Sequence, residues 1–251
     1  MNQDTRELYN QTAQRWQRRE PNSLSDFTAR PRVFDLCGEV RDLSVVDLGC
    51  GEGYCAREIA SRGAAQIQGI ELSQSMVDLA KSQQRPEDAV IEYRQGNVTD
   101  LPYADESFDL AMGVFVYNYL TIQQTGQSFS EVFRVLKPGA AFVFSVPHPA
   151  FPFIRADHEA PFYFDAMGNG YFSSRDQQCQ GEIHCRDGSV LNVQMIPKSL
   201  EDYFSLLAGA GFSTLPQVQE YGVTQDMLEL DREFFEPVAD VPLHLAFRII
   251  R

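Results

Sequence analysis

The sequence predicts an α/β fold, in which short buried strands alternate with helices around an open sheet. Three observations support this: residues 45–48 are mostly apolar, glycines follow them, and residues 55–61 then have the pattern of a helix. A short apolar run rich in β-branched residues is typical of a strand buried on both faces of a sheet. The main domain is therefore predicted to begin with a strand, a glycine-rich turn and a helix.

The turn after this first strand has glycine at alternate positions, Gly49, Gly51 and Gly53. Such a turn leaves backbone N–H groups at the carboxyl edge of the sheet, where open α/β sheets bind their ligands. A dinucleotide fingerprint is disfavoured, because Tyr54 obstructs the close helix packing that its third glycine allows. No Lys-Ser or Lys-Thr pair follows the last glycine, so a P-loop is disfavoured as well. The turn predicts a site for a nucleotide-like cofactor.

Length and composition favour one α/β domain with an elaborated cap. The 251 residues are 43% hydrophobic and carry a net charge of −14, and such an acidic chain is a poor partner for nucleic acid. No apolar run approaches the ~18 residues of a membrane span, and the N-terminus lacks a signal segment. The five cysteines contain no CxxC pair. We therefore expect a cytoplasmic protein with free thiols and no membrane or nucleic-acid partner.

Four stretches in order resemble motifs of the class I S-adenosylmethionine (SAM) dependent methyltransferases. They are Asp47-x-Gly49-x-Gly51-x-Gly53, the loop Gly96–Pro102, the segment Ser107-Phe108-Asp109 before a strand, and the turn Leu136-Lys137-Pro138-Gly139 before another strand. Any one of them can arise by chance, whereas all four fall in register within residues 43–147. The chain is thereby identified as a member of this family, in its small-molecule branch of the methyltransferase type 11 kind.

The resemblance implies SAM as cofactor, S-adenosylhomocysteine as its product, and a set of binding residues. By resemblance Leu72 packs on the adenine, Asn97 and the backbone of Val98 read the adenine edge, and Val114 lies under the methionine part. Plainer alternatives are a core leucine for Leu72 and a turn residue for Asn97, which replaces the commoner Asp. The expected cofactor-binding residues are Tyr9, Arg30, Asp47, Gly49, Gly51, Glu71, Leu72, Asn97, Val98 and Val114.

Glu71 ends the predicted second strand, residues 65–73. A carboxylate there can accept hydrogen bonds from both hydroxyls of a ribose, in NAD and in SAM sites alike. Glu71 therefore supports an adenosine cofactor without deciding which. Ser73 is a suitable N-cap for the helix that follows, and residues 90–94 are predicted to form the third strand.

Residues 1–41 are expected to form lid helices over the cofactor. Residues 5–19 resemble the family's opening segment, in which an aromatic residue closes over SAM, a contact worth roughly 0.5–2 kcal/mol. For Tyr9 that role and ordinary packing are equally compatible with the sequence, whereas for Trp16 packing is the favoured interpretation. A second helix should begin near Arg30, because Pro31 suits a first helical turn. Arg30 is a candidate partner of the cofactor's carboxylate, the alternative being a solvated surface arginine.

After residues 42–147, the expected SAM-binding core, residues 148–198 depart from the α/β pattern. They are rich in aromatic residues, and residues 182–196 are predicted to form a β-hairpin around Asp187-Gly188. We expect this insertion to be a cap that shapes the substrate pocket. The alternatives are a peripheral aromatic mini-core and a dimer surface.

His148 is the candidate catalytic base, because it directly follows the fifth strand between two prolines. A backbone-bonded histidine and a substrate-orienting donor are its alternatives. Tyr117, Asn118 and Tyr119 are candidates to line the same pocket. His158 and His184 are expected on the surface or in the cap, and no spacing supports a metal site. The Asn-Pro-Pro-aromatic tetrad of nucleic-acid and protein amide methyltransferases is absent after the fourth strand.

Residues 199–251 are expected to complete the core sheet. They contain a helix at 199–210 and two strands, 218–223 and 242–250, while residues 225–240 have no clear assignment. By resemblance the last two strands form the family's closing antiparallel pair. The fold is then a seven-stranded Rossmann-like class I methyltransferase fold with strand order 3-2-1-4-5-7-6 and an aromatic cap insertion.

These expectations combine into a SAM-dependent methyltransferase that methylates an oxygen or nitrogen atom of a small molecule, as a monomer or homodimer. Three alternatives remain open. They are an NAD-linked oxidoreductase, a C-methyltransferase that needs no base, and a non-catalytic SAM-binding module.

Overall fold

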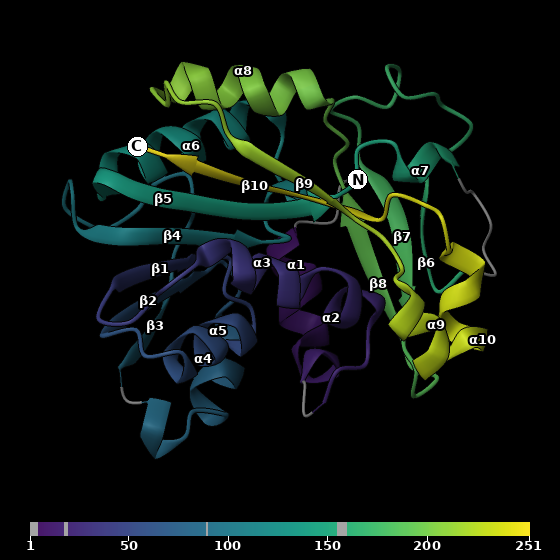
Figure 1. Cartoon of the computed structure of the whole chain (residues 1–251), viewed down its shortest axis with the longest axis horizontal. Coiled ribbons are helices and arrows are strands. Elements are labelled where there is room, and N and C mark those ends of the chain that lie inside the picture. Colours follow the sequence, from purple (N-terminus) through teal and green to yellow (C-terminus); the bar gives the residue numbers. More distant parts are fainter. Residues whose placement is uncertain (1–4, 18–19, 89, 155–159) are drawn as a thin grey trace.

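A seven-stranded sheet forms the centre of the computed structural model, which describes residues 5–17, 20–88, 90–154 and 160–251 (Figure 1). Its strands are β1 (Ser44–Leu48), β2 (Gln66–Glu71), β3 (Ile91–Gln95), β4 (Phe108–Val114), β5 (Leu136–Pro147), β9 (Gln217–Tyr221) and β10 (His244–Ile250). Their order is β3-β2-β1-β4-β5-β10-β9, and β10 runs antiparallel to both β5 and β9. Counting only these strands, the order is the predicted 3-2-1-4-5-7-6, and the predicted α/β fold is confirmed.

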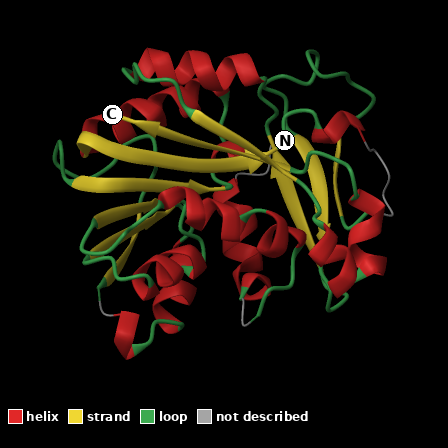
Figure 2. Cartoon of the chain, in the orientation of Figure 1, coloured by secondary structure: helices red, strands yellow, loops and turns green. Residues whose placement is uncertain are grey.

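Helices cover both faces of this sheet (Figure 2). On one face lie α3 (Arg30–Cys37), α4 (Tyr54–Ser61) and α5 (Gln74–Ser82), and on the other lie α6 (Ile122–Val135) and α8 (Leu200–Ala210). Val45 packs in the first layer, whereas Val46 and Leu48 pack in the second. Successive residues of a strand point to opposite faces. Because both faces of β1 are buried, the strand is apolar nearly throughout.

Capping residues set where the helices begin, and the cap at Ser73 confirms the predicted one. Ser73 accepts a hydrogen bond from the Met76 N–H at the start of α5, and Ser199 forms a capping box with Asp202 at the start of α8. Pro31 lies in the first turn of α3, where its missing N–H costs no hydrogen bond. These helix starts are local features, and each agrees with its predicted position to within a residue or two.

The cap is a separate three-stranded antiparallel sheet beside the carboxyl ends of β4 and β5 (Figure 1). It consists of β6 (Phe162–Asp165), β7 (Cys179–His184) and β8 (Val190–Met195), with the short helix α7 (Phe151–Ile154) before it. The hairpin of β7 and β8 confirms the predicted one, whereas β6 is an additional strand. Residues 225–240, which have no sequence-based assignment, form α9 (Gln225–Leu230), α10 (Arg232–Phe235) and the 3-10 helix η4 (Glu236–Val238).

The cap and this late segment share one hydrophobic cluster. Phe235 and Val238 pack with Phe151, Phe162 and Phe164 there, although some 70 residues separate the two groups in the chain. Their fully buried side chains make the C-terminal helices part of the cap's core. Phe172, in contrast, is 80% exposed and belongs to none of the buried clusters.

The N-terminal helices lie against α5 and the cap. They are α1 (Thr5–Thr12), the 3-10 helix η1 (Ala13–Trp16) and α2 (Leu24–Thr28). Ala13 packs against Met76 and Leu79 of α5, and the Asn10 side-chain oxygen accepts a hydrogen bond from Ser73 Oγ at 2.6 Å. The remaining short helices are η2 (Pro86–Asp88) and η3 (Tyr117–Tyr119).

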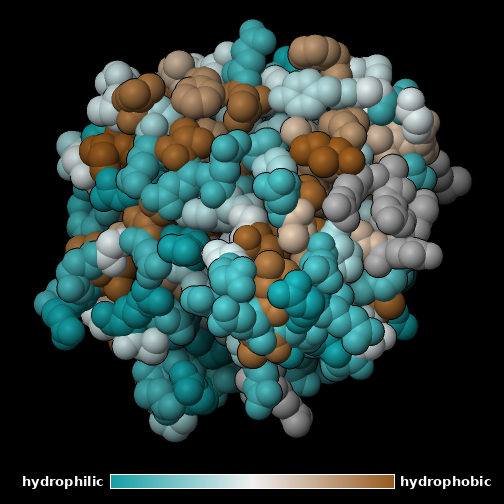
Figure 3. Space-filling model, turned by 45° about the vertical axis from the view of Figure 1, so that its right-hand side comes forward, coloured by the Kyte–Doolittle hydropathy of each residue, from teal (hydrophilic) through white to brown (hydrophobic). Residues whose placement is uncertain are grey.

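The surface carries mixed hydrophilic and hydrophobic side chains, and the cysteines are free thiols. On the face in Figure 3, hydrophobic side chains lie in small groups among hydrophilic ones, which is normal for a protein surface. None of the helices in the described ranges is long and apolar enough to span a membrane. The five cysteines are buried and form no disulfide in the described part of the chain.

Replacing Phe235 by alanine tests whether the C-terminal helices support the cap. We expect Phe235→Ala to lower the free energy of unfolding in urea by about 3–5 kcal/mol, because it leaves a cavity at a fully buried ring. The matched control is Phe172→Ala at an exposed ring, with an expected change below about 0.5 kcal/mol. Equal effects of the two substitutions would contradict this account of the cap.

Candidate functional site

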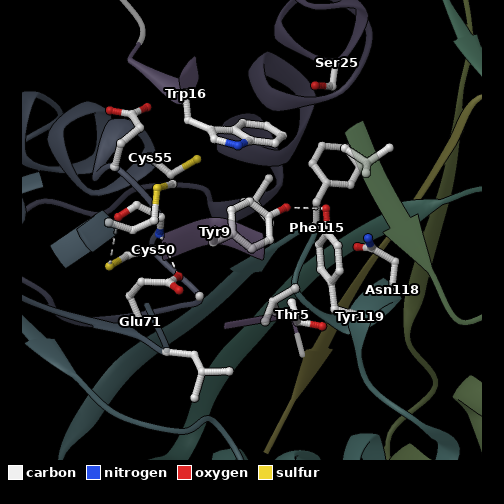
Figure 4. A pocket seen from close by; sticks show the side chains of 18 of the residues that line it. Thr5, Tyr9, Trp16, Ser25, Cys50, Cys55, Glu71, Phe115, Asn118 and Tyr119 are labelled. Atoms are coloured by element: carbon white, nitrogen blue, oxygen red, sulfur yellow. Dashed lines mark hydrogen bonds between the residues drawn. The ribbon is translucent and has the colours of Figure 1, made fainter. Parts of the chain in front are cut away.

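A cavity of about 280 Å³ lies where the carboxyl ends of β1, β2 and β4 meet the N-terminal helices and the cap (Figure 4). Every residue expected to bind the cofactor lines this cavity, namely Tyr9, Arg30, Asp47, Gly49, Gly51, Glu71, Leu72, Asn97, Val98 and Val114. These residues come from segments far apart in the chain. The cavity also receives Phe162, Phe164, Ile183 and Val193 from the cap.

The glycine turn brings the backbone close to its neighbours. Gly49 and Gly53 have φ angles of +67° and +85°, a conformation that L-residues with a side chain rarely adopt. A Cβ atom at Gly49 would lie 2.7 Å from Cγ2 of Val116, and one at Gly53 would lie 2.4 Å from the Tyr93 hydroxyl oxygen. Tyr54, which follows, lines the cavity. Both backbone conformation and space therefore require glycine at these two positions.

Glu71 is held at the edge of the sheet by two backbone N–H groups. Its Oε2 accepts from the Gly51 N–H at 3.1 Å, and its Oε1 accepts from the Ser73 N–H at 2.9 Å. Burial raises the pKa of this carboxyl, and the two hydrogen bonds oppose that rise. Each oxygen retains a lone pair, so the carboxylate can accept further hydrogen bonds from a ligand in the cavity.

Asp47 is the most unusual carboxyl of the cavity. It is 1% exposed, and its Oδ2 atom has no hydrogen-bond partner among the described residues. Burial raises its pKa to about 7, and the negative charges of Glu71 and Glu52 add to this effect. Glu52 forms an ion pair with Arg57 at 2.7 Å, so it is the carboxyl groups of Asp47 and Glu71 that favour a positively charged ligand at the turn. These carboxyl groups therefore fit SAM, whose sulfonium and ammonium groups are cationic.

Arg30 is buried, which excludes the surface alternative. It is 7% exposed and its Nη1 atom lies 2.7 Å from Oδ1 of Asp26. Its guanidinium carbon lies 5.4 Å from the ring centroid of Phe115, and its Nε atom has no partner within the described ranges. The Arg30 side chain thus offers one N–H donor beside the cavity while Asp26 offsets its charge.

Tyr9 lines the cavity and is joined to Tyr119, another lining residue, by a hydrogen bond. Its hydroxyl donates a hydrogen bond of 2.5 Å to the Tyr119 hydroxyl, and the two rings meet edge to face at 5.6 Å (Figure 4). Trp16 packs on Tyr9 at 5.4 Å and also lines the cavity. Packing and covering are therefore compatible for both aromatic residues, because they form one aromatic layer over the site.

The far end of the cavity is formed by Leu72, Asn97 and Val98. Leu72 is 36% exposed, so it is no core leucine. The side-chain oxygen of Asn97 accepts from the Thr99 N–H at 3.1 Å, as the turn alternative predicts. Asn97 therefore has a local structural role in addition to its place on the cavity wall.

His148 lies outside the cavity, which corrects the expectation of a base near the site. Its Nε2 atom lies 2.8 Å from Oε1 of Glu220, and its Nδ1 atom accepts from the Ala150 N–H at 3.1 Å. Pro147, the residue before it, lines the cavity. Successive residues of an extended chain point in opposite directions, so His148 turns away where Pro147 faces inward.

His244 occupies the place that was expected for His148. It pairs with Pro147 in the register of β5 and β10, and it lines the cavity. Its pKa is lowered to about 3, by burial first and then by the charges of Arg30 and His148. The sequence predicts strand 242–250 but offers no signal for this residue, because its position depends on pairing between distant strands.

The other candidates separate into two groups. Asn118 and Tyr119 line the cavity as expected, whereas Tyr117 is fully buried in the core against Phe129 and Phe144. His184 is partly exposed and lies 2.9 Å from Glu182, while His158 lies outside the described residues. Over the described parts of the chain, no cluster of three or more His, Cys, Asp or Glu residues is suited to a metal ion.

The chain is similar to methyltransferases in sequence and fold. Residues 45–139 match a family described as a methyltransferase domain. A demethylmenaquinone methyltransferase of Lactococcus lactis is 29% identical over 182 residues, 69% of this chain and 65% of that protein. Sterol methyltransferase-like 1 of Botryococcus braunii is 33% identical over 113 residues, 44% of this chain and 28% of that protein. The matched region thus spans less than two thirds of these relatives' length.

Solved structures agree on the fold. A SAM-dependent methyltransferase from Mesorhizobium loti superposes with a TM-score of 0.65 at 23% identity, covering 88% of this chain and 96% of that one. Geranyl diphosphate C-methyltransferase from Streptomyces coelicolor gives a TM-score of 0.62 at 18% identity, covering 88% and 77%. At such identities the likeness concerns the fold alone.

The raised pKa of Asp47 predicts how stability depends on pH. Between about pH 4 and 7 the unfolded chain releases this proton while the folded chain retains it, so rising pH destabilises the fold. We expect Asp47→Asn to unfold in urea with a larger free energy than wild type at pH 8, by on the order of 1–4 kcal/mol, and the difference to shrink towards pH 5. Asp226→Asn, at an exposed carboxylate, is the control. Parallel pH profiles of wild type and Asp47→Asn would contradict the assignment.

Proposed function

We propose that the chain is a class I methyltransferase, on the similarity of residues 45–139 to a methyltransferase domain, and that it transfers the methyl group of SAM to an oxygen or nitrogen atom of a small molecule. One observation carries this proposal. The buried carboxyl groups of Asp47 and Glu71 line the cavity beside the glycine turn, and Asp47 Oδ2 has no partner in the described chain. A cationic nucleotide-like cofactor matches this end of the cavity in charge and in hydrogen bonding.

The residues around the turn have distinct roles in this proposal. Glu71 accepts hydrogen bonds from the ribose hydroxyls, and Arg30 Nε–H binds the carboxylate of the cofactor. Leu72, Asn97 and Val98 hold the adenine, Val114 lies under the methionine part, and Tyr9 with Trp16 covers the cofactor and excludes water. When bound, SAM supplies an electrophilic methyl group on a positively charged sulfur.

The protein's contribution to methyl transfer is alignment and desolvation. The substrate is held on the cap side, against Phe162 and Phe164, so that its nucleophile faces the methyl group at the carboxyl end of β4. Such positioning can supply much of the rate enhancement of a displacement reaction. Neither His148, which is outside the cavity, nor His244, with its low pKa, suits the role of general base.

A C-methyltransferase is the second candidate. No histidine among the described residues is suited to act as a base, and aromatic residues of the cap line the cavity. Both features are compatible with attack by an activated carbon atom. The relatives include proteins named as O-methyltransferase and as C-methyltransferase, so they do not decide the acceptor atom. An NAD-linked oxidoreductase is disfavoured, since the matched domain is a methyltransferase domain.

Calorimetric titration tests the cofactor. We expect SAM and S-adenosylhomocysteine to bind with Kd on the order of micromolar and NAD⁺ not to bind. Glu71→Ala should weaken SAM binding by about 10- to 100-fold, because charge-assisted hydrogen bonds are lost. Glu220→Gln, at a carboxylate outside the cavity, should bind as wild type does. Absence of SAM binding by the intact protein would overturn the proposal.

Labelled methyl transfer tests the acceptor atom. Incubation with methyl-labelled SAM and pools of small molecules, followed by mass spectrometry, should give an O- or N-methylated product. His148→Ala should retain full activity, because His148 does not line the cavity. A C-methylated product would favour the second candidate. Tight SAM binding with no product from any pool would instead favour a non-catalytic SAM-binding module.

A further inference from the structure

The cap side of the cavity carries buried polar atoms that lack partners. They are both ring nitrogens of His244 and the side-chain oxygen of Asn118, none of which forms a hydrogen bond with any residue the structure describes. His244 comes from β10 and Asn118 from η3, and both residues line the same cavity. A buried polar atom without a partner costs free energy. Three such atoms on one cavity wall indicate that a ligand supplies the missing hydrogen bonds.

The imidazole of His244 is surrounded by aromatic rings. Its ring centroid lies 5.1 Å from that of Phe115 and 5.9 Å from that of Phe162. Phe164 and Val193 continue this apolar wall. Because the pKa of His244 is lowered to about 3, the ring is neutral at pH 7 and presents one N–H donor and one acceptor nitrogen.

The two ends of the cavity differ in charge. Figure 4 shows Glu71 and Asn118 on opposite sides of Tyr9. The carboxyl groups gather at the glycine turn, whereas the cap side presents a neutral imidazole, an amide and aromatic rings. The charge of Arg30, which helps to lower the pKa of His244, also disfavours a cation beside that ring. An anion there would meet the side-chain oxygen of Asn118, which is itself a hydrogen-bond acceptor.

We propose that His244 is the substrate anchor, which hydrogen-bonds an uncharged hydroxyl or amino group of a flat, largely apolar molecule lying against Phe115 and Phe162. Asn118 supplies a second acceptor to the same molecule. The assignment rests on the proposed function, because it places the substrate opposite SAM. His244 acts by binding rather than by removing a proton, since an imidazole with so low a pKa is a weak base.

Matched bicyclic probes test the anchor in the protein saturated with S-adenosylhomocysteine. The probes are 2-naphthol, naphthalene and 2-naphthoate, which share one ring system and differ in the polar group. By calorimetry we expect 2-naphthol to bind at least about tenfold more tightly than the other two. In ¹⁵N spectra, 2-naphthol should shift the His244 ring signals and leave those of His148 unchanged.

Substitutions at His244 separate the hydrogen bond from the ring shape. His244→Phe should abolish the preference for 2-naphthol over naphthalene, because it keeps an aromatic ring and removes both nitrogens. His244→Gln, which retains a donor and an acceptor, should keep part of the preference. His148→Phe, at the histidine outside the cavity, is the matched control and should keep all of it.

Each outcome bears on the proposal. An undiminished preference for 2-naphthol in His244→Phe would overturn the anchor, and so would tighter binding of 2-naphthoate than of 2-naphthol. S-adenosylhomocysteine is titrated into every variant, and unchanged binding shows that the cofactor end remains intact. If wild type fails to bind S-adenosylhomocysteine, the proposed function fails. The three probes titrated into the ligand-free protein then still test the anchor.

Discussion

The site depends on the hydrogen bonds by which the Glu71 carboxylate joins three elements. Glu71 ends β2, and its two oxygens accept from the N–H groups of Gly51, in the glycine turn, and Ser73, at the start of α5. The glycine turn follows β1, which pairs in parallel with β2. The hydrogen bond from Gly51 to Glu71 therefore fastens the turn to the end of the neighbouring strand. Ser73 also donates a hydrogen bond to Asn10 of α1, so the N-terminal helix is attached to the same corner of the sheet.

Charge divides the cavity into two working ends. At the glycine turn, burial and mutual repulsion keep Asp47 close to its protonation midpoint at neutral pH, which makes this end costly for the protein alone and favourable for a cation. At the cap, His244 remains neutral among aromatic rings. Asp47 and His244 are thus buried polar groups with unpartnered atoms in one cavity. Each suits a different class of ligand, a cation at Asp47 and an uncharged group at His244. Strained or unsatisfied groups are expected at functional sites for this reason.

The cap is stabilised from a distant part of the chain. Phe235 and Val238 complete the hydrophobic cluster of β6 and α7, and Leu24 of α2 packs in the same cluster. Phe162 and Phe164, which line the cavity and are proposed to contact the substrate, belong to it as well. The wall of the substrate end is thus part of a packed core, which gives it a defined shape.

The sequence by itself determined the features that depend on neighbouring residues. Val45–Leu48, the glycine turn and the N-cap Ser73 follow from local periodicity and backbone preference, Glu71 follows from its place at the carboxyl edge of the sheet, and the resemblance to a family implies most of the other candidate cofactor residues. Only the tertiary structure decided between His148 and His244 and assigned residues 225–240 to the cap. The pairing of β5 with β10 orients the two histidines, and the burial of Phe235 requires a cluster built by a separate segment. Such contacts have no local signature, because their free energy arises only when distant parts of the chain meet.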